Sequence, residues 1–144
     1  MSVVETLPII YTAHSKLSFF CRDTICEYVL RKQCVPLNPF RLFDYFLGDR
    51  VERDLVRRGN NNVVRIADET WVFGEVSNGV LFEIQYATDL GKPVRYFTIG
   101  TRREDIKEIE VGDVRFERGA LKSVGFTESE GRRAIEASLL TQRR

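Results

Sequence analysis

The stretch ADETWVFGEVSNGVLFE, residues 67–83, decides the fold of this chain. Residues 70–76 are rich in β-branched and aromatic side chains and form a run short enough for a buried strand. The polar turn Ser77–Asn78–Gly79 follows, and from there the apolar residues recur at helical spacing until Gly91 and Pro93 end the helix and start another strand. The stretch therefore predicts a β–α–β unit, whose ligands bind beyond the carboxyl end of the strand and at the amino end of the helix.

Glu83 is the unusual residue of this helix. On a helix over residues 79–90, its neighbours three and four positions away are small or apolar, namely Gly79, Val80, Tyr86 and Ala87. Its side chain should therefore face the sheet, where an unpaired carboxylate is costly to bury. Glu83 is then either a core acid with a hydrogen-bond partner or a catalytic group near the strand ends.

The composition is that of an ordinary folded domain, and we expect residues 1–144 to form one domain. A net charge of +1 gives no reason to expect nucleic acid or an anionic membrane as partner. There is no apolar run of membrane-spanning length and no leader-like start, so the cytoplasm is the expected location. Three cysteines without a CxxC pair and one histidine argue against disulfides and zinc. Neither GxGxxG nor a P-loop is present, and we expect no cofactor or metal.

The remaining elements alternate as in α/β proteins. Ser15 is a candidate N-cap for a helix with an inward face formed by Phe19, Ile25, Tyr28, Val29 and Leu30. Thr127 and Glu130 form a capping box for a last helix. The segment Glu108–Glu117 alternates around a Gly–Asp turn, as a hairpin would. The predicted strands are 8–13, 34–37 and 93–99, and the predicted helices are 15–32, 49–67 (interrupted at Asn60–Asn62) and 127–141.

The run Ser77-x-Gly79-x-x-x-Glu83-x-x-x-Ala87-x-x-x-Gly91-Lys92-Pro93-Val94 resembles the signature of the nucleoside 2-deoxyribosyltransferase-like superfamily. This superfamily includes the transferases and the 2′-deoxynucleoside 5′-phosphate N-hydrolases. Weaker similarity lies upstream, in Ile10–Ala13, Val35–Pro39 and Ala67–Asp68, so that the resemblance covers residues 8–99. It implies a Rossmann-like (flavodoxin-like) three-layer sandwich with a mainly parallel sheet, to which residues 100–144 add a hairpin and a helix.

The resemblance also implies roles for individual residues. Glu83 is at the position of the nucleophile that attacks the sugar at C1′, and Tyr11 is at the position of the tyrosine that orients it; a core tyrosine is the alternative. Asp68 is a further catalytic candidate, although an Asp that ends a helix before a strand is often a structural cap. Lys92 is expected to be only a helix C-terminal charge.

Substrate contacts are implied near the strand ends. In the hydrolase branch the serine at the Ser77 position contacts the 5′-phosphate, and the backbone of Asn78 and Gly79 could assist, although Ser77 could equally be a plain N-cap. Further candidate substrate-binding residues are Asn38, His14, Ser15 and Asn60. The family usually has glycine at the position of His14 and an acid at that of Asn60, and an amide cannot donate a proton as an acid can.

Three functions stay open. The first is cleavage or transfer at a nucleoside or nucleotide N-glycosidic bond, the second is a nucleotide-binding domain that has lost the chemistry, and the third is an interaction domain. The aromatic segment 39–48 forms a lid, flanks a flat ligand or makes a subunit contact, through Phe40, Leu42, Phe43, Tyr45, Phe46 and Leu47. The resemblance implies a homo-oligomer.

Overall fold

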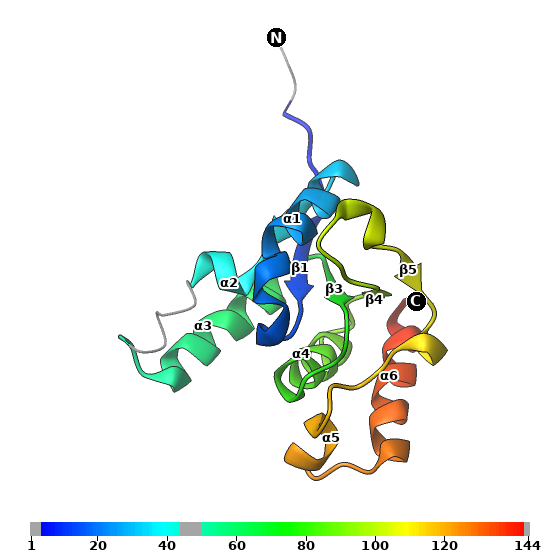
Figure 1. Cartoon of the computed structure of the whole chain (residues 1–144). Helices are drawn as coiled ribbons and strands as arrows, with labels where there is room; N and C mark the ends of the chain where they lie inside the picture. Colours follow the sequence, from blue (N-terminus) through cyan, green and yellow to red (C-terminus); the bar gives the residue numbers. More distant parts are fainter. Residues whose placement is uncertain (1–3, 44–49, 143–144) are drawn as a thin grey trace.

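The computed structural model describes residues 4–43 and 50–142, with side chains as far as residue 139. Five strands form one sheet in the order β2-β1-β3-β4-β5 (Figure 1). The first four strands run parallel to their neighbours, and β5 pairs antiparallel with β4. The strands are β1 (Ile9–Ala13), β2 (Val35–Leu37), β3 (Glu69–Phe73), β4 (Val94–Phe97) and β5 (Glu108–Ile109).

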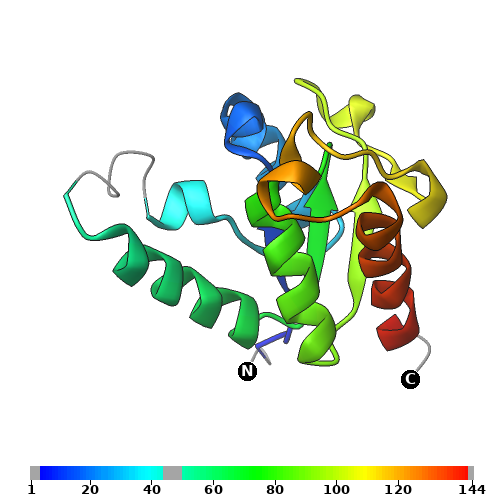
Figure 2. The ribbon, with the colours of Figure 1, turned by 90° about the horizontal axis from the view of Figure 1, so that it is seen from below.

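Helices cover both faces of the sheet (Figure 2). The 3-10 helix η1 (Lys16–Cys21) and α1 (Arg22–Arg31) lie on one face, and α3 (Arg53–Ile66), α4 (Asn78–Asp89) and α6 (Glu128–Gln142) lie on the other. Successive strand residues point to opposite faces, so that Ile10 packs with α1 while Tyr11 packs with α3 and α4. The prediction of a three-layer α/β fold with a mainly parallel sheet is confirmed.

Short elements complete the chain. They are α2 (Pro39–Leu42), η3 (Arg103–Asp105), η4 (Val111–Asp113) and α5 (Ala120–Ser123). In the described part of the chain, no helix has the length and apolarity that crossing a membrane requires.

The caps follow the sequence closely. The Ser15 hydroxyl accepts a hydrogen bond from Leu17 N–H, and Thr127 and Glu130 exchange the two hydrogen bonds of a capping box. Both predictions are confirmed. Lys92 is a helix C-terminal charge as expected, but its ammonium group donates to the carbonyls of Arg65 and Ala67, and it therefore serves the end of α3 and not that of its own helix.

The predicted hairpin at Glu108–Glu117 does not form. Its first residues pair with β4 as β5, and its Gly–Asp turn lies in the 3-10 helix η4. The later residues pair with position 76: Val76 N–H donates to Arg115 O (2.9 Å) and Glu117 N–H donates to Val76 O (2.8 Å). The two halves of the alternating segment do form strand-like pairs, but with two different partners. The first half pairs with the edge of β4, and the second pairs with Val76, just after β3, because both places have backbone groups that can form hydrogen bonds.

Two further expectations about helices are wrong. The three asparagines do not interrupt α3, which is continuous because packing against α4 outweighs the weak propensity of asparagine. Leu30 is 57% exposed and lies outside the buried face of α1, to which Ile25 and Val29 belong.

Candidate active site

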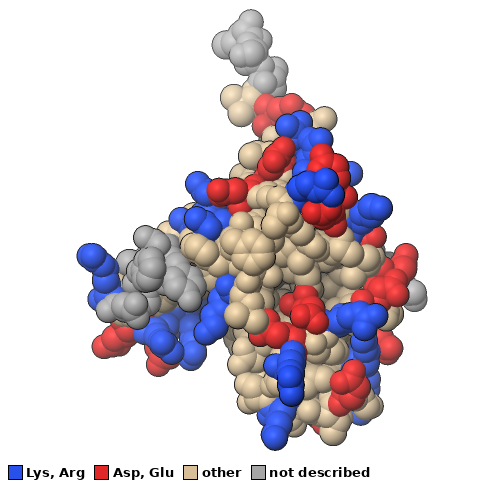
Figure 3. Space-filling view, in the orientation of Figure 1, with Lys and Arg blue, Asp and Glu red and all other residues tan. Residues whose placement is uncertain are grey.

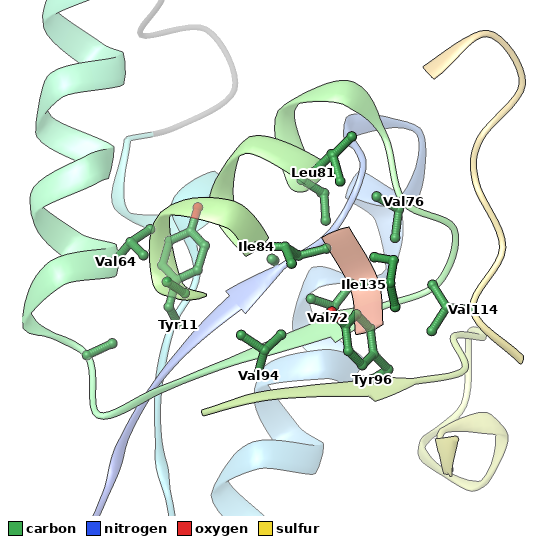
Figure 4. Close-up of a cluster of buried hydrophobic side chains, with 14 of the residues drawn as sticks. Tyr11, Val64, Val72, Val76, Leu81, Ile84, Val94, Tyr96, Val114 and Ile135 are labelled. Carbon is green, nitrogen blue, oxygen red and sulfur yellow. The ribbon is translucent and has the colours of Figure 1, made fainter. Parts of the chain in front are cut away.

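Glu83 lies in a cluster of three polar side chains from three different elements. Tyr11 comes from β1, Asn60 from α3 and Glu83 from the second turn of α4. The Tyr11 hydroxyl donates to Glu83 Oε2, and Asn60 Nδ2 donates to the same oxygen at 2.7 Å and to the Tyr11 hydroxyl at 2.8 Å. In Figure 4, Tyr11 lies between Val64 of α3 and Ile84 of α4, in the core between these two helices and the sheet. The fold thus holds one carboxylate oxygen with two donors.

The other carboxylate oxygen of Glu83, Oε1, is not held by such donors in the described part of the chain. Both hydrogen bonds that Glu83 makes within the described residues end on Oε2, and none reaches Oε1. The carboxylate is therefore fixed in orientation through Oε2, and Oε1 accepts no hydrogen bond from the described residues. A carboxylate that is oriented in this way can serve as a nucleophile.

Burial shifts the ionisation of this cluster toward neutral groups. Desolvation raises the pKa of Glu83 to about 7, against the lowering effect of the hydrogen bonds from Tyr11 and Asn60. The pKa of Tyr11 is also raised, first by its complete burial and then by the charge of Glu83. Tyr11 therefore stays a hydrogen-bond donor at neutral pH, whereas Glu83 gains and loses its proton there.

A second polar cluster surrounds Asn38. Its Oδ1 accepts hydrogen bonds from the backbone N–H groups of Phe40 (2.9 Å) and Arg41 (3.2 Å), which caps α2. Its Nδ2 donates to Thr12 Oγ1 (2.9 Å) and lies 3.0 Å from His14 Nε2. Desolvation lowers the pKa of the buried His14 to about 4, so its ring is neutral at pH 7.

The amino end of α4 is occupied by its own side chains. Ser77 Oγ accepts from Val80 N–H (3.2 Å), and Asn78 Oδ1 accepts from Gly79 N–H (2.8 Å). The Asn78 amide donates to the hydroxyl of Ser123, which belongs to α5. Ser77 is thus an N-cap, and this role is compatible with the predicted contact to a phosphate, which stays a prediction.

Ser15 meets a residue that the sequence pattern did not single out. Its hydroxyl donates to Glu117 Oε2 at 2.5 Å, across a separation of 102 residues. Glu117 is brought there by the pairing of residues 115–117 with Val76. Because that pairing was predicted as a local hairpin, only the correct partner of the segment could have revealed this contact.

Asp68 lies apart from the Glu83 cluster in its contacts. It precedes β3, and its carboxylate accepts the backbone N–H of Ile9 at 2.7 Å. This bond joins the amino ends of β1 and β3, whereas ligands of parallel sheets bind at the carboxyl ends. The geometry favours the structural reading of Asp68.

Two aromatic rings of the segment 39–48 border these clusters. The ring of Phe40 lies 4.8 Å from that of His14, and Phe43 lies against Gly59, next to Asn60. Tyr45, Phe46 and Leu47 lie outside the described residues. Phe40 therefore borders the Asn38 cluster, and Phe43 borders the part of α3 that carries Asn60.

Comparison with known proteins finds a matching family and solved structures with the same fold. The family described as a domain of unknown function, DUF7768, matches residues 17–97, more than half of the chain. The chain belongs to the DUF7768 family. A solved structure, the 2-deoxyribosyltransferase from the psychrotolerant bacterium Bacillus psychrosaccharolyticus, shares the fold of this DUF7768 protein with a TM-score of 0.50 at 17% sequence identity. The similarity covers 85% of this chain and 95% of the transferase. No curated protein matches the chain.

Proposed function

We propose that this DUF7768 protein cleaves or transfers at the N-glycosidic bond of a nucleoside or nucleoside 5′-monophosphate, with Glu83 as nucleophile. One observation carries the proposal: the Glu83 carboxylate, raised in pKa by burial, is held through a single oxygen by Tyr11 and Asn60. The fold shared with a 2-deoxyribosyltransferase supports the same reading.

The chemistry follows from the carboxylate. Glu83 Oε1 attacks C1′ while the C1′–N bond breaks and its electron pair passes to the leaving base, through a transition state in which the sugar carries positive charge. Water, or a second base, then attacks C1′ of the glycosyl ester and restores the carboxylate. The hydrogen bonds from Tyr11 and Asn60 keep Oε2 in place through both steps.

Proton delivery separates the two leading functions. The leaving base needs a proton, and the Asn60 amide can donate a hydrogen bond but cannot give up a proton at neutral pH. The Asn60 amide instead donates its hydrogen bonds to Glu83 and Tyr11. If the base takes its proton from water, the site is an enzyme; if it cannot, the same pocket binds nucleotides without turnover, which is the second candidate.

The test is base release from a panel of the common nucleosides, 2′-deoxynucleosides and their 5′-monophosphates, followed by chromatography with and without an acceptor base. Glu83→Gln should lower kcat by at least about 10³-fold, as loss of a nucleophile does. Glu136→Gln removes an equal charge from an exposed position of α6 and should leave kcat unchanged. Equal activity of the wild type and Glu83→Gln would overturn the role of Glu83, and tight binding with no released base would support the binding domain. Assembly as a homo-oligomer stays a prediction.

A further inference from the structure

We propose that the exposed side of α3 binds duplex DNA through its phosphate backbone. The inference goes beyond the proposed function and does not depend on the chemistry of Glu83. It is carried by an uneven distribution of charge: α3 has four arginines, no lysine and a single acidic residue, Asp54. Glu52, which precedes the helix, is offset by the exposed Arg50. Because the whole chain has a net charge of only +1, the rest of the chain is net negative, and positive charge is concentrated on this helix.

The four arginines of α3 are exposed, and their charges are hardly neutralised. They are Arg53, Arg57, Arg58 and Arg65. Arg57 lies 3.8 Å from Asp54, but both side chains are more than two-thirds exposed, and such pairs are weak in water. The other three arginines make no ion pair within the described residues, and Arg65 donates only to the uncharged amide oxygen of Asn62 at 2.9 Å. Their guanidinium groups are therefore available to an anionic partner.

The arginines share one side of a helix that projects from the molecule. With 3.6 residues per turn they lie within a sector of about 140°, and they extend about 18 Å along the helix axis. Val64, the buried residue of α3, lies in the last turn, so the first turns have little of the core beneath them. In Figure 3, basic side chains gather at the left edge of the molecule, where Figure 1 places α3. A partner can therefore approach the arginines without meeting the rest of the chain.

The chemistry and the shape of this surface fit duplex DNA. A guanidinium group binds a phosphate with two parallel hydrogen bonds, which the ammonium group of lysine cannot do. The surface is a convex rod about 10–12 Å in diameter, and the major groove of duplex DNA, about 12 Å wide, admits such a helix. Phosphates along the edges of the groove then meet arginines that are spread around the helix.

Other anionic partners fit this surface less well. An acidic peptide needs a pocket that anchors one of its side chains. Two cavities of the described chain lie between α4 and α6 and between α1 and α2, and neither is lined by a residue of α3. A membrane surface needs a continuous apolar face on the helix. The exposed apolar residues of α3, Leu55 and Ile66, are about three turns apart and form no such face.

The experiment measures the affinity of the full chain for a fluorescently labelled duplex of about two helical turns, by anisotropy at several salt concentrations. If all four arginines contact phosphates, the logarithm of the association constant should fall with the logarithm of the salt concentration with a slope of about −3.5. Arg53→Gln combined with Arg58→Gln should weaken binding at least about tenfold at 0.1 M salt and halve this slope.

The matched control removes the same charge from another part of the surface. Arg118→Gln combined with Arg133→Gln changes two exposed arginines outside α3, and neither of these makes an ion pair within the described residues. This variant should keep the wild-type affinity within about twofold and keep the slope. Because all four substituted side chains are exposed, both double variants should unfold at the same temperature as the wild type.

Wild-type affinity in the α3 variant, or an equal loss of affinity in the control, would overturn the proposal. Unlabelled single-stranded DNA, polyglutamate of equal charge and phosphatidylserine vesicles serve as competitors. If one of them displaces the labelled duplex as well as unlabelled duplex does, α3 is a general anion-binding surface and the proposal fails. No turnover is measured, so the result is independent of the base-release assay.

Discussion

The Asn38 and Asn60 clusters contain the same chemistry arranged in two ways. Each joins an asparagine to a titratable group that burial has shifted toward its neutral form, His14 in one case and Glu83 in the other. Asn38 sends its oxygen to backbone N–H groups and thereby caps α2. The Asn60 amide donates only to side chains, namely to Oε2 of Glu83 and to the Tyr11 hydroxyl, which itself donates to the same oxygen of Glu83. The comparison shows that the Asn38 cluster stabilises the local backbone at the start of α2, whereas the Asn60 cluster orients the carboxylate of Glu83.

The largest expected effect comes from exchanging each asparagine for alanine. Asn38→Ala should lower the free energy of unfolding by about 2–4 kcal/mol, because it removes a helix cap and leaves buried Thr12 and His14 short of a partner. Asn60→Ala should cost about 1 kcal/mol or less, because alanine is the better helix former, yet it should lower base release at least tenfold.

Urea unfolding and the base-release assay check both halves of this prediction. The two variants serve as controls for each other, since each removes one amide from a polar cluster. Equal losses of stability, or an Asn60→Ala protein with full activity, would contradict the distinction between a structural Asn38 cluster and an Asn60 cluster that orients Glu83.

The next effect concerns pH and has opposite signs in the two clusters. The folded-state pKa of Glu83 is raised from 4.5 to about 7, so the folded chain holds a proton that the unfolded chain has lost, and stability should fall by about 2.5 kcal/mol from pH 5 to pH 8. The folded-state pKa of His14 is lowered from 6.5 to about 4, so the unfolded chain holds the extra proton, and stability should rise by about 2 kcal/mol over the same range.

In the wild type these two contributions nearly cancel. Glu83→Gln should therefore expose a rise in stability with pH, and His14→Gln should expose a fall, both measured by urea unfolding between pH 5 and pH 8. Parallel pH profiles for the two variants and the wild type would contradict the assigned shifts. In the activity assay, kcat should rise with pH through about 7 as Glu83 loses its proton.

The smallest effect comes from a hydroxyl outside both clusters. Thr70 lies opposite Tyr11 in the sheet, is buried, and its Oγ1 has no hydrogen-bond partner within the described residues. Thr70→Val should stabilise the fold by about 1 kcal/mol, because it replaces an unsatisfied oxygen with a methyl group. Thr12→Val, which removes an oxygen that Asn38 needs, should destabilise it. Thermal unfolding of the pair checks the signs, and a Thr70→Val protein less stable than the wild type would point to a hidden partner.

Much of the fold could be predicted because its signals are local. The apolar runs of β1, β3 and β4, the N-caps at Ser15 and Ser77, and the capping box at Thr127 are each defined within a few residues. The inward position of Glu83, which is half-buried, followed from helical spacing in the same way. Tyr11 was proposed as a partner of Glu83 from a family resemblance, whereas Asn60 was expected to contact the substrate and its bond to the carboxylate was not foreseen.

The rest depended on contacts between distant segments. Whether residues 115–117 pair with 108–110 or with Val76 is decided by which strand edge is open, and the alternating pattern fits both. The position of Glu117 beside Ser15 depends on that choice. The three asparagines of α3 show the same limit, since their propensity says nothing of the packing that overrides it.

The central place of β1 has a consequence for how this family should be delimited. The match to DUF7768 begins at residue 17, after β1, although β1 lies between β2 and β3 and carries Tyr11. It also ends at residue 97, before the segment that reaches Ser15. A fragment cut at those limits would lose a middle strand of its sheet and could not fold as an autonomous unit. A fragment that keeps the whole core runs from residue 8 to at least Ser138, because Ile135 of α6 is buried in the core and Ser138 is hydrogen-bonded to Tyr96 of β4. Relatives trimmed to the matched region should therefore be extended at both ends before they are expressed.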